Sequence, residues 1–330
     1  MSQRPAILRF LNRQGWVLGL FVLLGLLLVF TRIIQPNYGA AGIGSLARSS
    51  LPFAFATAAQ VVVVIAGGVD LSIASMMALT SVTAAVLMDG ASEEFAILVV
   101  PLVLLLGLSI GAINGALIVI TRVPDIVVTL AMLFVWEGAA LLVLASPGGA
   151  AAEWLKVLLV GTVAIPGVPP EITAWIPKAF VLLVVCIGVV WIPLTRSRLG
   201  LSIYAIGSNN LAAFRSGVAV GRTKIVAYAV AGLFAAMGGL VLTMSTGIGA
   251  PIPGPYLLAS VAAVVLGGVV LGGGRGGIVG PLVAVFILRL VRSDLTFLSV
   301  DPNVATIVEG TIMVVVVMLG AIVAVRTRPA

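Results

Sequence analysis

The chain of 330 residues contains no histidine and one cysteine, Cys186. Without histidine there is no imidazole to bind a metal or to transfer protons near neutral pH. A single cysteine cannot form a disulfide within the chain. No G-x-x-x-x-G-K-S/T loop occurs either, so the chain has no P-loop for ATP. These absences make an enzyme a poor interpretation, and we predict no cofactor and no metal site.

Charged residues are also scarce. They make up 9% of the chain, whereas a soluble domain carries roughly 25%. Hydrophobic residues account for 61%, and the mean hydropathy is +1.28. The net charge of +7 is spread thinly along the chain, so the positive-inside rule explains it better than nucleic-acid binding does. The composition therefore predicts a protein embedded in a lipid bilayer.

Apolar runs near the bilayer-spanning length of about 20 residues follow one another along the chain. They predict an all-α polytopic membrane protein of about ten transmembrane helices, in one transmembrane domain covering residues 1–330. The run after the three arginines of residues 1–15 is too long for a signal peptide, so this segment reads as a cytoplasmic N-terminal tail. The predicted spans are 16–34, 47–66, 71–88, 95–121, 126–145, 178–194, 223–246, 256–272, 277–293 and 303–325.

Ten spans place both termini in the cytoplasm, with twelve Lys and Arg residues inside and six outside. The largest outer segment is then 146–177, which is rich in proline and glycine and predicts a loop with short interfacial helices. Segments 111–122 and 280–292 each start with glycine, end with arginine and run in opposite directions across the membrane. This weak similarity suits an inverted repeat.

One long hydrophilic stretch, Thr195–Lys224, carries five of the eighteen basic residues and no acid. We predict that residues 195–222 form a cytoplasmic coupling segment. Ser208 or Asn209 can cap a short helix there that suits insertion into a groove on a partner. The alternative is a helix lying on anionic lipid headgroups. The docking candidates are Asn209, Leu211, Ala212, Ala213, Phe214, Arg215, Ser216 and Gly217.

Residues 66–75, AGGVDLSIAS, interrupt an apolar run with polar groups. Gly67 and Gly68 permit a helix break, and Asp70 or Ser72 can cap the helix that restarts. A broken helix at membrane depth is tolerated where it is buried in protein or lines a wet cavity. The segment is therefore either part of a solute pathway, with Asp70 and Ser72 as solute contacts, or a tight cytoplasmic turn.

Further polar residues lie inside apolar runs. Glu137 is costly there and is either a site residue or packed between helices. The neighbouring Trp136 offers a stacking face for a sugar ring. Asn114 is either a solute contact or a hydrogen-bonding group between helices. A structural ion pair is expected of Glu309 with Arg289 or Arg292.

Taken together, these motifs resemble the permease subunits of bacterial ABC importers for ribose, xylose, galactose and related sugars. The resemblance covers residues 48–325 and implies a type II importer fold and a dimeric permease in the inner membrane. It also implies separate ATPase subunits at the cytoplasmic loops and a periplasmic solute-binding protein outside. The matching pieces are Gly67–Ser72, Asn114–Gly115, Thr129–Leu130, Tyr204–Gly217 and Ala262–Gly280.

The chain departs from this family at a few positions. Ala74 stands where the family usually has glycine, and Asp125 follows a proline where phenylalanine is usual. Glu137 and Glu309 occupy positions that are more often basic. These departures leave open the solute, and whether the second permease is an identical copy or a paralogue.

We therefore predict the membrane-spanning subunit of an ABC importer, which translocates a monosaccharide or similar small polar solute by alternating access. The alternative is a self-sufficient secondary transporter or channel that uses intramembrane acidic residues. A membrane-embedded enzyme is disfavoured because histidine is absent.

Overall fold

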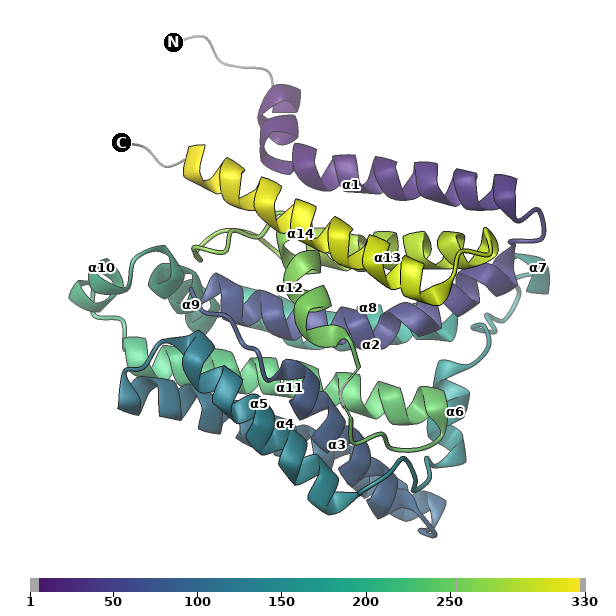
Figure 1. The fold of residues 1–330 in the computed structure, drawn as a ribbon, viewed down its shortest axis with the longest axis horizontal. Coiled ribbons are helices and arrows are strands. Elements are labelled where there is room, and N and C mark those ends of the chain that lie inside the picture. The colour runs from purple at the N-terminus through teal and green to yellow at the C-terminus, as the bar shows by residue number, and fades with distance from the viewer. Residues whose placement is uncertain (1–5, 253, 327–330) are drawn as a thin grey trace.

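The computed structural model describes residues 6–252 and 254–326, which fold into fourteen helices (Figure 1). This confirms the predicted all-α fold. The helices are α1 (Ala6–Ile34), α2 (Ala40–Ile65), α3 (Ile73–Met88), α4 (Glu93–Thr121), α5 (Asp125–Val143), α6 (Glu153–Leu159), α7 (Pro170–Thr173), α8 (Lys178–Arg196), α9 (Arg198–Ser208), α10 (Asn210–Arg215), α11 (Val220–Thr246), α12 (Tyr256–Leu266), α13 (Val279–Phe297) and α14 (Pro302–Arg326).

Each of the ten predicted spans corresponds to one helix, although some boundaries differ. Helix α1 starts at Ala6, inside the segment expected to be a tail, and α2 starts seven residues before the predicted span. The predicted span 256–272 is too long. Helix α12 ends at Leu266 because Gly268 adopts a left-handed backbone conformation with φ of +84°, which ends a right-handed helix.

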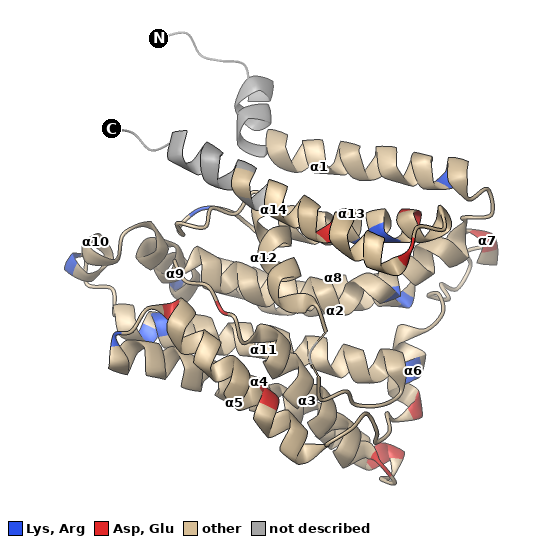
Figure 2. Cartoon of the chain, viewed as in Figure 1, with Lys and Arg blue, Asp and Glu red and all other residues tan. Residues whose placement is uncertain are grey.

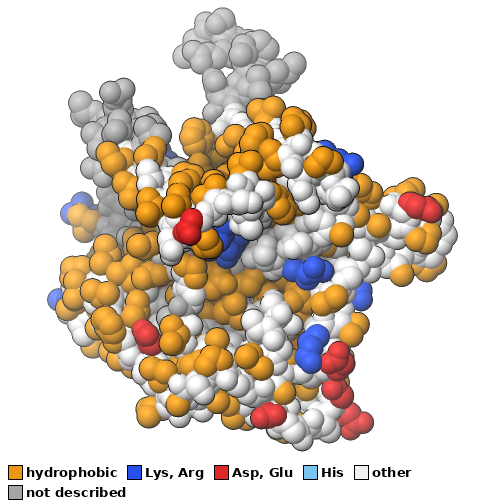
Figure 3. Space-filling view, turned by 45° about the vertical axis from the view of Figure 1, so that its right-hand side comes forward, with side chains coloured by type: hydrophobic (Ala, Val, Ile, Leu, Met, Phe, Trp, Pro, Cys, Tyr) orange, Lys and Arg blue, Asp and Glu red, His pale blue; other side chains and the backbone are white. Residues whose placement is uncertain are grey.

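Within the part of the chain that the structure describes, six helices are long and apolar enough to cross a membrane: α1, α2, α4, α5, α8 and α11. Large apolar side chains on their outer faces remain exposed, for example Leu142 on α5 at 90%. Apolar side chains also cover much of the face shown in Figure 3. Charged residues lie mainly near the two ends of the helices (Figure 2). Such a surface is stable in lipid, whose chains are as apolar as leucine.

Helices α2, α3, α4 and α11 form the centre of the bundle, whereas α1 packs against α13 at one edge (Figure 1). Helices α4 and α11 approach closely because small residues face each other. Gly107, Gly111 and Gly115 follow at intervals of four residues on α4, and a Cβ at Gly111 would overlap the backbone of Tyr228 and Gly232 on α11. Spacing of this kind allows two membrane helices to pack backbone against backbone.

Two sets of helices share one order, α2–α5 and α11–α14. Each contains a long helix, a non-helical segment, a short helix and then two further helices. The non-helical segments are 66–72 before α3 and, among the described residues, 247–252 and 254–255 before α12. In this order α4 corresponds to α13, and these two helices run in opposite directions in Figure 1. These helices contain 111–122 and 280–292, so the arrangement fits an inverted repeat.

The two long hydrophilic segments lie at opposite ends of the bundle (Figure 1). Helices α9 and α10, within the predicted coupling segment, are at one end. Helices α6 and α7, within residues 146–177, are at the other, where short helices were expected.

Candidate functional site

The helix is interrupted between α2 and α3, and the Asp70 side chain within this break stabilises it by hydrogen bonds. Gly67 has a φ of +87°, which turns the chain out of the helix. The Oδ1 atom of Asp70 accepts hydrogen bonds from the backbone amide of Ser72 at 2.8 Å and from its hydroxyl at 2.6 Å. The Ser72 side chain itself makes no capping bond. Both residues are fully buried, whereas Gly67 at the start of the break is exposed.

Side chains of α2 and α5 hold the backbone of the break. With its amide oriented to satisfy both groups, Gln60 donates to the Asp70 carbonyl at 3.0 Å and accepts from the Asp70 amide at 3.3 Å. The hydroxyl of Thr129 accepts from the Leu71 amide at 3.1 Å and lies 3.3 Å from the Val69 carbonyl. Backbone groups away from water need such partners. The break is therefore a defined structure within the bundle.

A chain of hydrogen bonds leads from the break through α4 to α5. The Asn114 Nδ2 group on α4 donates to the Ser72 hydroxyl at 2.8 Å, and Asn114 Oδ1 accepts from Trp136 Nε1 on α5 at 3.1 Å. Asp70, Ser72 and Asn114 are fully buried, while Trp136 is partly exposed. Four of the five pathway candidates thus form one connected group, which we call the polar chain.

The fifth pathway candidate, Glu137, lies outside the polar chain. It follows Trp136 on α5 and is partly exposed. Its carboxylate has no hydrogen bond or ion pair with the other residues that the structure describes.

Helix α10 presents the docking candidates at one end of the molecule. The Asn209 Oδ1 atom accepts from the Ala212 amide at 2.9 Å and caps the helix, and Gly217 follows its end with a φ of +83°. Leu211 is 59% exposed and Phe214 is 67% exposed, whereas Ala213 is buried. The helix therefore presents an apolar face, with Arg215 in its last turn, away from the bundle.

Helix α9 connects α10 to the break through glycines. The Gly274 amide donates to the carbonyl of Ile65, the last residue of α2, at 2.9 Å. A Cβ on Gly273 would lie 2.7 Å from the Gly207 carbonyl oxygen and 2.8 Å from Gly67 Cα. We call Gly67, Gly207, Gly273 and Gly274 the glycine junction. It brings the coupling segment into direct contact with the helix break.

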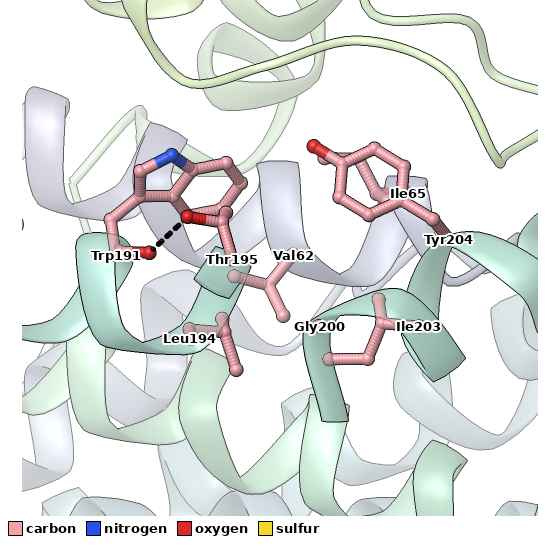
Figure 4. A pocket seen from close by; sticks show the side chains of 8 residues that line it. All are labelled: Val62, Ile65, Trp191, Leu194, Thr195, Gly200, Ile203 and Tyr204. Atoms are coloured by element: carbon pink, nitrogen blue, oxygen red, sulfur yellow. Dashed lines mark hydrogen bonds between the residues drawn. The ribbon is translucent and has the colours of Figure 1, made fainter. Parts of the chain in front are cut away.

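A small cavity lies beside this region, between α2, α8 and α9 (Figure 4). Its volume is about 10 Å³, which is room for no more than about one water molecule. It is too small for a sugar. The cavity is lined by Val62, Ile65, Trp191, Leu194, Thr195, Gly200, Ile203 and Tyr204.

The acidic residue of α14 pairs with one of the two arginines named from the sequence. Glu309 forms an ion pair with Arg292 at 2.5 Å. The Arg289 guanidinium instead lies 5.2 Å from the centre of the Phe53 ring and 6.0 Å from that of Tyr256. A cation over an aromatic face is stabilised by the ring. These contacts join α13 to α2, α12 and α14, which is a structural role.

Some residues of the site did not follow from the sequence reasoning. Gln60 is fully buried and holds the break. Its signal is visible in retrospect, because it is a long polar side chain inside an apolar run. Tyr228 and Lys224 contact Asp125, although they lie 103 and 99 residues away in the sequence. No spacing rule joins positions so far apart.

A polytopic helical bundle with a buried, hydrogen-bonded helix break is the architecture of a membrane transport subunit. The chain belongs to the family described as the branched-chain amino acid transport system / permease component, whose model matches residues 42–317. No solved structure matches the chain.

Several curated relatives cover almost the whole chain. The autoinducer 2 import system permease protein LsrD of Escherichia coli (strain K12) is 29% identical over 318 residues, which is 93% of this chain and 92% of the relative. The protein of the same name from Shigella flexneri gives the same values. That from Photorhabdus temperata is 28% identical over 316 residues, covering 93% of this chain and 91% of the relative.

These similarities identify the chain as the membrane-spanning permease subunit of an ABC importer, which confirms the predicted resemblance and transport class. In this family ATP is hydrolysed by separate subunits. The family also implies ABC ATPase and periplasmic solute-binding partners, and a multi-pass location in the inner membrane.

Proposed function

We propose that this permease imports a monosaccharide or a similarly small polar solute by alternating access. The relatives are named for autoinducer 2 import, which makes autoinducer 2 the first solute to test. The observation that carries the proposal is the polar chain, because it ties the helix break to Trp136 at the edge of the bundle.

The members of the polar chain have different roles in this proposal. Asp70, Ser72 and Asn114 are fully buried, so no solute reaches them in this conformation. They fix the break and the position of the Trp136 ring. Trp136 and Glu137 are partly exposed, and we place them at the surface that the solute meets. An indole face suits an apolar sugar face, and a carboxylate accepts hydrogen bonds from hydroxyl groups.

Helix α10 is the proposed docking element for the ATPase. Its exposed Leu211 and Phe214 suit an apolar groove, and the glycine junction would pass movement of α9 and α10 to the break. In this proposal residues 195–222 and both termini lie in the cytoplasm, and residues 146–177 lie on the outer side. A second permease, either an identical copy or a paralogue, would complete the pathway.

Co-purification tests the docking role. We expect Phe214→Asp with Arg215→Glu to reduce recovery of the ATPase with the permease at least about tenfold, because a charge replaces the exposed apolar anchor. Ile172→Asp is the matched control, since Ile172 on α7 is 58% exposed at the opposite end. It should leave recovery unchanged. Unchanged recovery with the α10 variant would rule out α10 as the docking element.

Reconstituted uptake tests the solute and the energy source. In proteoliposomes that hold the permease, the ATPase and the binding protein, we expect ATP-dependent uptake of labelled autoinducer 2 or of a monosaccharide. Trp136→Ala should reduce this uptake while the ATPase remains bound. Uptake by the chain alone, driven by an ion gradient and independent of ATP, would instead support a secondary transporter.

A further inference from the structure

An ion pair joins the start of α5 to the second turn of α11, near the coupling segment. Asp125 is the first residue of α5, and Lys224 and Tyr228 lie one turn apart on α11. The Lys224 ammonium lies 2.6 Å from Asp125 Oδ1, and the Tyr228 hydroxyl donates to Asp125 Oδ2 at 2.8 Å. The Asp125 and Lys224 side chains are only 13% and 19% exposed, and Tyr228 is fully buried.

The side chains of Asp125 and Tyr228 pack directly against the helix break at Gly68. A Cβ built on Gly68 would lie 2.7 Å from the Tyr228 hydroxyl and 3.2 Å from the Asp125 carboxyl carbon. The same turn of α5 also holds the break through Thr129, whose hydroxyl donates to the Asp125 carbonyl at 2.9 Å and accepts from the Leu71 amide. The break thus packs against Asp125 and Tyr228 at Gly68, and it is hydrogen-bonded to Thr129 at Leu71.

The ion pair links helices that otherwise pack mainly on other partners. Helix α5 packs chiefly on α3 and α4, and α11 packs on α4, α2 and α3. Helix α11 starts at Val220, a few residues after α10 ends at Arg215, so a shift of α10 reaches Lys224 within about one turn of α11. A charge pair shielded from water is favourable only while both partners keep their geometry. The Asp125–Lys224 pair therefore favours the packing of α5 and α11 seen here over packings that separate the two side chains.

We propose that Asp125, Lys224 and Tyr228 form a latch, which holds the break in the packing seen in this structure and opens when α10 moves the start of α11. These are positioning residues, because they act on the solute pathway through the break. The inference rests on the proposed function of α10 and extends it to a defined contact. Opening one discrete contact between packed helices is a common way to switch between two packings.

The test uses the complete complex of permease, ATPase and solute-binding protein in proteoliposomes. The variants are Asp125→Asn, Lys224→Gln and both together. We measure uptake, and the ratio of ATPase rates with and without solute-loaded binding protein. Each single variant leaves one shielded charge unpaired and should lower the yield of folded permease. The double variant should recover the yield, while its ATPase ratio falls towards one and its uptake falls at least about tenfold.

A double variant of the other ion pair, Arg292→Gln with Glu309→Gln, is the matched control and should keep the wild-type ratio. Wild-type ratio and uptake in Asp125→Asn with Lys224→Gln would overturn the latch. The docking proposal is tested separately, by recovery of the ATPase with the Phe214→Asp, Arg215→Glu variant. The latch is tested by uptake and the ATPase ratio in a complex that keeps its ATPase, so the two proposals can fail independently.

A second measurement does not depend on the folding of these variants. Cysteines at positions 125 and 224, in a Cys186→Ser background, are linked by a short cleavable thiol reagent after the complex has formed. The unlinked double-cysteine complex lacks the ion pair and should show the same reduced uptake as Asp125→Asn with Lys224→Gln. Linking the two positions should stop this remaining uptake, and cleaving the link should return it to the unlinked level. Wild-type uptake by the linked complex would overturn the proposal.

Discussion

The hydrogen bond between Trp136 and Asn114 offers a quantitative test of the polar chain. Trp136→Phe removes the indole N–H and keeps an aromatic ring, and Asn114→Ala removes both the acceptor at 3.1 Å and the donor to Ser72 at 2.8 Å. Polar pairs between membrane helices contribute about 0.6 kcal/mol on average and up to about 1.7 kcal/mol. We therefore expect a coupling free energy of about 0.5–1.5 kcal/mol between the two substitutions. Asn114→Ala alone should lower the free energy of unfolding by about 1–3 kcal/mol, because it removes one buried and one partly buried hydrogen bond.

The assay is reversible unfolding of the purified chain in mixed micelles, with the two single variants and the double variant forming a cycle. Ser109→Ala replaces Asn114→Ala in a control cycle with Trp136→Phe, because among the described residues the Ser109 hydroxyl bonds only to the Leu105 carbonyl of its own helix. The control cycle should be additive within about 0.3–0.5 kcal/mol. Equal additivity for Asn114 and Trp136 would show that the polar chain does not hold α5 to α4.

Gly207→Ala places a Cβ that overlaps the Ile65 carbonyl and the Gly274 amide. We therefore expect a loss of stability of about 1–3 kcal/mol and less uptake per ATP hydrolysed. A wild-type ratio of uptake to ATP hydrolysis would argue against the glycine junction. Asn209→Ala removes the cap of α10 at a cost of about 0.5–2 kcal/mol and should weaken ATPase co-purification, whereas Asn209→Ser keeps a capping oxygen and should not. For topology, Phe214→Cys in a Cys186→Ser background should react with an impermeant thiol reagent only from the cytoplasmic side; reaction from outside would reverse the proposed orientation.

Much of the candidate site was predictable because it breaks a local rule. Asp70, Ser72, Asn114 and Trp136 are polar or amphipathic groups inside apolar runs, where each one requires a partner. The same reasoning extends to Gln60, which holds the break from α2. What local reasoning could not give is the order of contacts. In the structure Asp70 accepts two hydrogen bonds from Ser72, and Glu137 stands apart from the other four candidates.

The coupling segment shows the same division. The capping side chain of Asn209 and the end of the helix before Gly217 act within one or two turns, so the sequence indicates both. The small-residue spacing at Gly107, Gly111 and Gly115 is equally visible, but it does not say which helix packs there. Helix α11 was identifiable as that partner only from the folded bundle.

The amino-acid sequence by itself determined the membrane class, the ten long or short apolar helices and the polar breaks between them. Each of these depends on hydropathy and backbone chemistry over fewer than about 30 residues. Only the tertiary structure decided that α9 meets the break through glycine, and that Asp125 and Lys224, 99 residues apart, close on Gly68. Such contacts depend on how helices pack, and packing between apolar helices is set by the shapes of both surfaces at once.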